Sequence, residues 1–133
     1  MTALTKDRPT AQRAGNLVAD PLATGVTIYA GAMYVLDGSG AATPATAAAT
    51  TPVRAVARKR AVQAEGDELT DGARGTFCFA NSVGGTAITR AHIGENAYAV
   101  DDQTVANAGT CIAGEVLDVD DGGVWVRIGT RVA

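Results

Sequence analysis

The sequence predicts a small all-β protein, a β-sandwich or barrel of about seven short strands with an extended N-terminal arm. Short stretches rich in β-branched and aromatic residues recur along the chain, and turns rich in Gly and Asp separate them. The spacing of apolar residues gives almost no helix signal, and no repeat of fixed period is present. With 133 residues, the chain is expected to form a single domain over residues 15–133, preceded by an arm over residues 1–14.

The predicted arm shows neither strand nor helix periodicity and has few large apolar groups. It carries three cations, Lys6, Arg8 and Arg13, together with Asp7 and Pro9. A segment of this kind is either a frayed terminus, which is the commoner case, or a segment that becomes ordered on the surface of a partner.

Residues 17–36 contain three short apolar stretches that predict strands. The sequence Asp-Gly-Ser-Gly at 37–40 follows the last of them and is a strong turn signal. Residues 41–51 are a low-complexity stretch of Ala and Thr in which Pro44 argues against a helix. We predict a surface loop for residues 41–51.

Residues 53–62 fit two interpretations. Pro52 would suit the first turn of a helix, whereas a strand would alternate the side chains between two faces. The β-rich sequence on both sides favours a strand, bent near Arg58.

The only run of basic residues is Arg58, Lys59 and Arg60. Such a run is either a solvated edge, with the stems of the arginines lying on the surface, or a contact to an acidic partner or a nucleic acid. Few aromatic residues lie nearby in sequence, so base stacking is unsupported. Of the functional interpretations, a protein contact is preferred to a nucleic-acid contact.

The clearest strand signal lies at residues 75–81, where Phe77 and Phe79 share one face and Cys78 lies on the other. Because these are the only two Phe residues, that face is expected to point into the core. One helical turn is expected at 89–94. Further strands are expected at 97–100, 112–119 and 124–128, the last two joined by a hairpin turn at 120–123.

Alanine dominates the apolar composition. Hydrophobic residues make up 47% of the chain, but 27 of them are Ala, and Val, Ile, Leu and Phe together also number only 27. Burial stabilises in proportion to apolar area, and Ala contributes little of it. We therefore expect a thin core, no large buried active-site cavity, and a chain that gains stability by docking onto a partner.

The remaining bulk properties exclude several classes of protein. The net charge of −3 gives no overall electrostatic footprint for nucleic acid, and no apolar stretch is long enough to span a membrane. The N-terminal sequence lacks the apolar segment of a secretory signal, so synthesis in the cytoplasm is expected. Cys78 and Cys111 are too few for a disulfide scaffold and are expected to be small buried thiols, although a bond between them stays open.

No catalytic, cofactor or metal motif is recognisable. The aspartates at 118–121 lack the ligand spacing of a calcium loop, and one His with two Cys matches no zinc spacing. Asp101 and Asp102 are expected in a turn, and His92 has no partner for nucleophilic catalysis. The sequence therefore predicts a protein that is not an enzyme and has neither a cofactor nor a metal.

Six segments covering nearly the whole chain resemble the capsid cement, or head decoration, proteins of tailed bacteriophages. They are TKDRPTAQRAG, VTIYAGAMYVLDGSG, VRAVARKRA, GTFCFANS, IGENAYAVDDQTVA and AGEVLDVDDGGVWVRIG. These segments match as patterns and not as catalytic signatures.

The resemblance implies a mostly β structural protein of the virion that binds the outer capsid surface and locks neighbouring subunits of the major capsid protein together. It implies a homo-oligomer, with a trimer favoured and a dimer as the other option, and no catalytic residues. In such proteins a terminal arm commonly reaches across a neighbouring subunit, which would give Lys6, Arg8 and Arg13 a contact role.

Two other classes of function stay open. The first is a soluble β-barrel module that binds carbohydrate or single-stranded nucleic acid, with Trp125 and Tyr98 as platform residues. The second is a small hydrolase that uses Asp101, Asp102 or His92.

Overall fold

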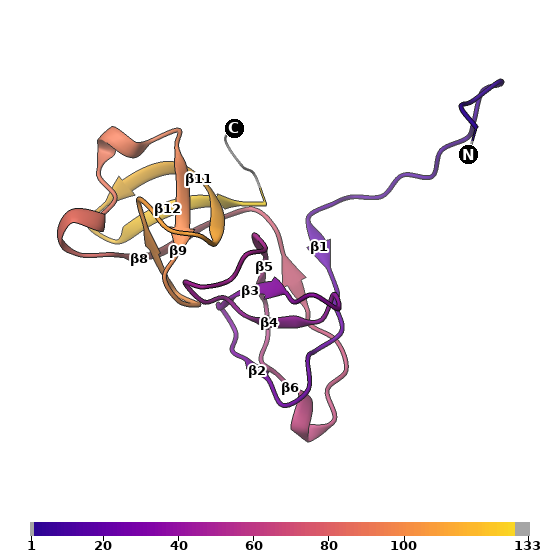
Figure 1. Cartoon of the computed structure of the whole chain (residues 1–133), viewed down its shortest axis with the longest axis horizontal. Coiled ribbons are helices and arrows are strands. Elements are labelled where there is room, and N and C mark those ends of the chain that lie inside the picture. Colours follow the sequence, from indigo (N-terminus) through magenta and orange to yellow (C-terminus); the bar gives the residue numbers. More distant parts are fainter. Residues whose placement is uncertain (1, 130–133) are drawn as a thin grey trace.

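The computed structural model describes residues 2–129, which form strands, three 3-10 turns and no α-helix (Figure 1). The strands are β1 (Leu17–Val18), β2 (Thr27–Ile28), β3 (Met33–Leu36), β4 (Ala42–Pro44), β5 (Val53–Ala57), β6 (Ala61–Val62), β7 (Gly72–Ala73), β8 (Thr76–Asn81), β9 (Asn96–Ala99), β10 (Thr104–Ala106), β11 (Ile112–Asp120) and β12 (Gly123–Ile128). The 3-10 turns are η1 (Gln63–Glu65), η2 (Gly84–Thr86) and η3 (Arg90–His92).

The predicted all-β class is confirmed, but the expected number of strands is wrong. The described residues contain twelve strands and not about seven. Four of them (β1, β2, β6 and β7) are only two residues long. The strands β1, β2 and β6 lie within stretches that predict strands, whereas β7 has no such signal, because two residues cannot show a periodicity of two.

An antiparallel sheet with the order β1-β7-β5-β3-β4 forms the N-terminal part (Figure 1). The segment after β1 forms backbone hydrogen bonds in two directions. The N–H of Leu22 donates to Glu68 O (3.0 Å) on the β7 side, and the N–H of Ala23 donates to Ala42 O (3.0 Å) on the β4 side. Residues 20–23 thereby join the chain that precedes β7 to the start of β4.

The expected surface loop at residues 41–51 is wrong in its first part. Ala42–Pro44 form β4, which pairs with β3, and Ala42 and Ala45 are buried. Pro44 is compatible with this strand because β4 is at the edge of the sheet, where a missing N–H donor costs no ladder bond.

The strand interpretation of residues 53–62 is confirmed. Val53–Ala57 form β5, Ala61–Val62 form β6, and the chain bends between them at Arg58, Lys59 and Arg60. The β6 strand pairs with β2 in a separate two-stranded unit.

The C-terminal part is a closed barrel in which β10, β8, β12, β11 and β9 follow one another. The pair β10–β8 is parallel and the other pairs are antiparallel. Alternate residues of β12 are buried as expected, beginning with Val124, while Trp125 lies outside. Phe79 is buried and Phe77 packs against the same core, which confirms the predicted face of β8.

One hydrophobic cluster joins the sheet to the barrel. It contains Met33 and Val56 of the sheet together with Phe79, Val105 and Val126 of the barrel. A second cluster fills the sheet side, where Tyr34 is surrounded largely by alanines. Ten of the 24 buried hydrophobic residues among the described ones are Ala, so the expected core of few large side chains is confirmed.

Candidate interaction surface

The N-terminal arm extends away from the folded part of the molecule (Figure 1). Residues 2–14 contain no strand or helix, and every side chain among them is exposed. Within the arm, the N–H of Thr10 donates to Arg8 O at 2.8 Å. The arm joins the sheet at β1, so β1 and the segment after it determine where the arm leaves the body.

The candidate contact cations of the arm have no carboxylate partner within residues 2–129. Four described cations form ion pairs, namely Arg54, Arg58, Arg90 and Arg127. Lys6, Arg8 and Arg13 are not among them. Their charges are therefore available to an external partner.

The second candidate group is the basic turn after β5, and only one of its three cations forms an ion pair among the described residues. Arg58 lies 3.7 Å from Asp71, and both side chains are about half exposed. Lys59 and Arg60 are exposed and form no ion pair in the described part of the chain. The arm runs outward from β1, away from the folded body, so the structure does not gather the arm and this turn into one site (Figure 1).

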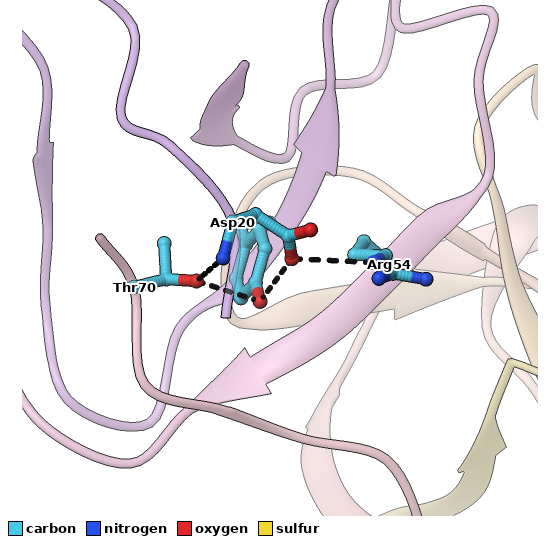
Figure 2. Close-up of polar contacts among 4 residues, drawn as sticks. Asp20, Arg54 and Thr70 are labelled. Carbon is cyan, nitrogen blue, oxygen red and sulfur yellow. Dashed lines mark hydrogen bonds and ion pairs between the residues drawn. The ribbon is translucent and has the colours of Figure 1, made fainter. Parts of the chain in front are cut away.

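A buried polar network holds the segment on which the arm is mounted. The Tyr34 hydroxyl donates to Asp20 Oδ2 (2.9 Å) and lies 3.0 Å from Thr70 Oγ1, while Arg54 Nε donates to the same Asp20 oxygen at 3.2 Å (Figure 2). The N–H of Asp20 donates to Thr70 Oγ1 at 3.0 Å. The network joins Tyr34 of β3 and Arg54 of β5 to two chain segments, one at Asp20 and one at Thr70. We call the line along which these two segments are hydrogen-bonded the seam.

Sequence analysis missed this network. Its members are separated by 14 to 50 positions, so no local motif could reveal it. The one usable signal is a Tyr among alanines, because a buried Tyr hydroxyl needs a polar partner.

Burial raises the pKa of Tyr34 to about 12, and the bond to Asp20 acts in the same direction. The folded state thus holds this proton more tightly than the unfolded state, where the pKa is about 10. The stabilisation is fully present below pH ~10 and is lost as the pH rises towards 12. We expect at most about 3 kcal/mol of unfolding free energy to disappear over that interval.

Difference spectroscopy of tyrosinate formation checks this expectation, together with urea unfolding across the alkaline range. The variant Tyr34→Phe is expected to lack the late titration step and to show a flatter alkaline loss of stability. Parallel alkaline losses in the two proteins would contradict the assignment.

Two of the three residues of the hydrolase hypothesis, Asp101 and His92, are engaged in their own turns, whereas Asp102 contributes its backbone oxygen, which accepts the N–H of Met33. Asp101 Oδ1 accepts the N–H groups of Gln103 (2.9 Å) and Thr104 (2.8 Å), and His92 Nδ1 accepts the N–H of Thr89 at 2.9 Å. The last bond stabilises η3, so the expected helical turn is present as a 3-10 turn. These bonds give Asp101 and His92 a structural role.

Trp125 and Tyr98 do not form a joint platform. In the barrel, β11 lies between their strands, and it pairs Trp125 with Asp118 but Tyr98 with Ile112. Six residues along one strand correspond to about 20 Å. The indole Nε1 of Trp125 also donates to Asp120 Oδ2 at 2.9 Å, which fixes the ring over its own hairpin.

The two thiols differ in their surroundings. Cys111 is buried as expected, and burial raises its pKa, whereas the expectation of a buried Cys78 is wrong. Cys78 lies on the outer face of β8, opposite the Phe residues, and that face is exposed. Both cysteines are free.

No group of three His, Cys, Asp or Glu side chains in the described residues could hold a metal ion. Across residues 2–129, no helix is long and apolar enough to cross a bilayer. No family model, no curated protein and no solved structure matches the chain.

Proposed function

We propose that the protein is a structural component of a bacteriophage virion, without enzymatic activity, that binds the outer capsid surface and cements neighbouring subunits of the major capsid protein. The observation that carries the proposal is the exposed N-terminal arm with its three unpaired cations, mounted on a hydrogen-bonded seam. The resemblance of the sequence to decoration proteins supports the same assignment.

The arrangement suits an anchor. The hydrogen bonds of the seam fix the point at which the arm leaves the body. The arm can then reach one subunit of a shell while the body rests on another. Each contact can be modest, because a lattice repeats it many times and avidity multiplies the effect. A homo-oligomer, with a trimer favoured, would add burial that the Ala-rich core lacks and would cover exposed apolar side chains such as Leu17 and Leu69.

Deletion of residues 2–14 tests the proposal. We expect the truncated chain to keep its melting temperature, because every side chain of residues 2–14 is exposed and the arm contains no strand or helix. We expect it to lose binding to capsid shells of its own phage that lack the decoration protein, measured by co-sedimentation and negative-stain imaging. Exchange of Lys6, Arg8 and Arg13 for Gln should weaken binding at least about tenfold, as expected for the loss of several charge-assisted contacts.

The double variant Lys59→Gln/Arg60→Gln is the matched control, since it removes exposed cations from the body and leaves the arm intact. If the arm is the anchor, this variant binds shells more strongly than the arm variants do. Unchanged binding after deletion of the arm would refute the anchor role, and absence of the protein from purified virions would refute the proposal as a whole.

A further inference from the structure

A cleft of about 340 Å³ lies where the sheet meets the barrel. Its walls are largely apolar and come from Leu36 of β3, Pro52, Val53 of β5 and Ala113 of β11. Thr51, Arg54, Arg74 and Gly129 complete the lining. The volume is within the range of cavities that bind small ligands.

Arg54 presents unfilled hydrogen-bond donors at this cleft. Its Nε donates to Asp20 Oδ2 at 3.2 Å (Figure 2). Within residues 2–129 its two terminal nitrogens have no acceptor. A guanidinium offers five N–H donors in a planar fork that matches a carboxylate, so most of the fork of Arg54 is open to a ligand.

Arg74 supplies the second cation. Its Nη2 donates to Gly129 O at 3.1 Å, and no carboxylate in the described part of the chain pairs with it. Its backbone N–H donates to Asn16 O, which ties it to the base of the arm. Two arginines with spare donors therefore line one apolar cleft.

A second hollow shares Arg54 with the cleft. That hollow, of about 420 Å³, is lined by Arg54 together with Arg13, Leu17, Thr70 and Asp71, among others. Arg13 belongs to the arm, so Arg54 lines both the cleft and a hollow that the arm also lines.

We propose that the cleft is a binding site for an extended, largely apolar segment of a partner protein that carries a carboxylate. The carboxylate accepts hydrogen bonds from the terminal nitrogens of Arg54 and from Arg74, while apolar neighbours of the acidic residue pack on Pro52 and Val53. The inference deepens the proposed function and rests on it for the identity of the partner, which would be the major capsid protein.

The surroundings favour a protein segment over a nucleic acid. The arm carries a net charge of +2, which leaves −5 for residues 15–133 of a chain whose total is −3. A body of that charge repels a polyphosphate, whereas a single carboxylate at two arginines is attracted locally. The apolar walls also suit side chains and not a sugar–phosphate backbone.

Titration of the isotope-labelled full chain, followed by NMR, tests the site. The probe is a capped pentapeptide, Val-Leu-Glu-Leu-Val, and its matched control carries Gln in place of Glu. We expect the Glu peptide to shift the Nε–H signals of Arg54 and Arg74 and the amide of Val53, with a dissociation constant on the order of 1 mM. The Gln peptide is expected to leave these signals unmoved.

The variant Arg74→Gln should weaken binding of the Glu peptide about tenfold, since it removes a charge-assisted contact without touching the Asp20 network. Arg90→Gln, on the barrel surface, is the control and should bind normally. Equal shifts with both peptides, or binding unaffected by Arg74→Gln, would overturn the site. Saturable shifts of the same signals by a short single-stranded DNA would overturn the choice of partner. Peptide binding and shell binding are separate measurements, so failure here leaves the anchor role of the arm standing.

Discussion

Replacement of Gly114 by Ala is expected to unfold the barrel or to leave it only marginally stable. Gly114 is the residue of β11 that pairs with Ala97 of β9 on one side and Ile128 of β12 on the other. A Cβ at this position would overlap the backbone carbonyl of Arg127. Backbone in the middle of a paired strand cannot rotate away as a side chain can, so the ladder itself would have to separate.

The expected cost is at least about 3 kcal/mol, at the upper end of what overpacking causes. Small domains are stable by only about 5–15 kcal/mol in total, so a large share of the stability would be lost. Thermal unfolding followed by circular dichroism should show a melting temperature lower by roughly 10 °C or more.

The control for this prediction is Gly38→Ala, in the turn after β3, where an added Cβ has nothing within 4 Å. It should leave the melting temperature almost unchanged. A Gly114→Ala protein as stable as Gly38→Ala would mean that β11 and β12 are not as closely paired as described.

The parts of the fold that sequence analysis predicted correctly are strands whose own residues alternate between apolar and polar. The alternation beginning at Val124 and the shared face of Phe77 and Phe79 are local patterns, and both are buried as expected. The bend at Arg58 was also readable, because a run of charged residues cannot continue a buried strand.

The missed parts depend on partners far away in the sequence. The strand β7 was not expected from its two residues, and it pairs with β1 across more than fifty positions and with β5 on its other side. Cys78 was expected to be buried from its residue type, but its exposure follows from the face of β8 on which it lies. Alternation along the strand was the better guide, and it was already visible next to Phe77 and Phe79.

The candidate site likewise has one part that the sequence predicted and one part that only the fold reveals. The arm cations and the basic turn are consecutive or nearly consecutive residues, so composition alone pointed to them. The cleft brings Arg54 and Arg74 together with residues of β3 and β11, and only the closed fold places these side by side. Neither arginine is part of a charged run, so nothing in the sequence distinguished them from ordinary surface cations.

A double-mutant cycle between Gly72 and Tyr34 is expected to show strong coupling. A Cβ on Gly72 would overlap the hydroxyl of Tyr34, whose ring is fully buried among alanines. Gly72→Ala alone must displace that hydroxyl from Asp20 and Thr70, and we expect a loss of about 2–4 kcal/mol in the free energy of unfolding. Tyr34→Phe alone removes the same hydroxyl without a clash and should cost about 1–3 kcal/mol.

In the double variant the hydroxyl that the added Cβ would strike is gone, so the loss should fall short of the sum of the single losses by at least about 1 kcal/mol. Equilibrium unfolding in urea measures all four proteins of the cycle. Gly38→Ala combined with Tyr34→Phe provides the matched cycle, and additivity is expected there because an added Cβ at Gly38 meets no neighbouring atom. Additive losses at Gly72 and Tyr34 would show that the hydroxyl is not pressed against β7. The seam at Asp20 and Thr70, from which the arm extends, would then be stabilised by the bonds of Asp20 to Arg54 and Thr70, without a contribution from Tyr34.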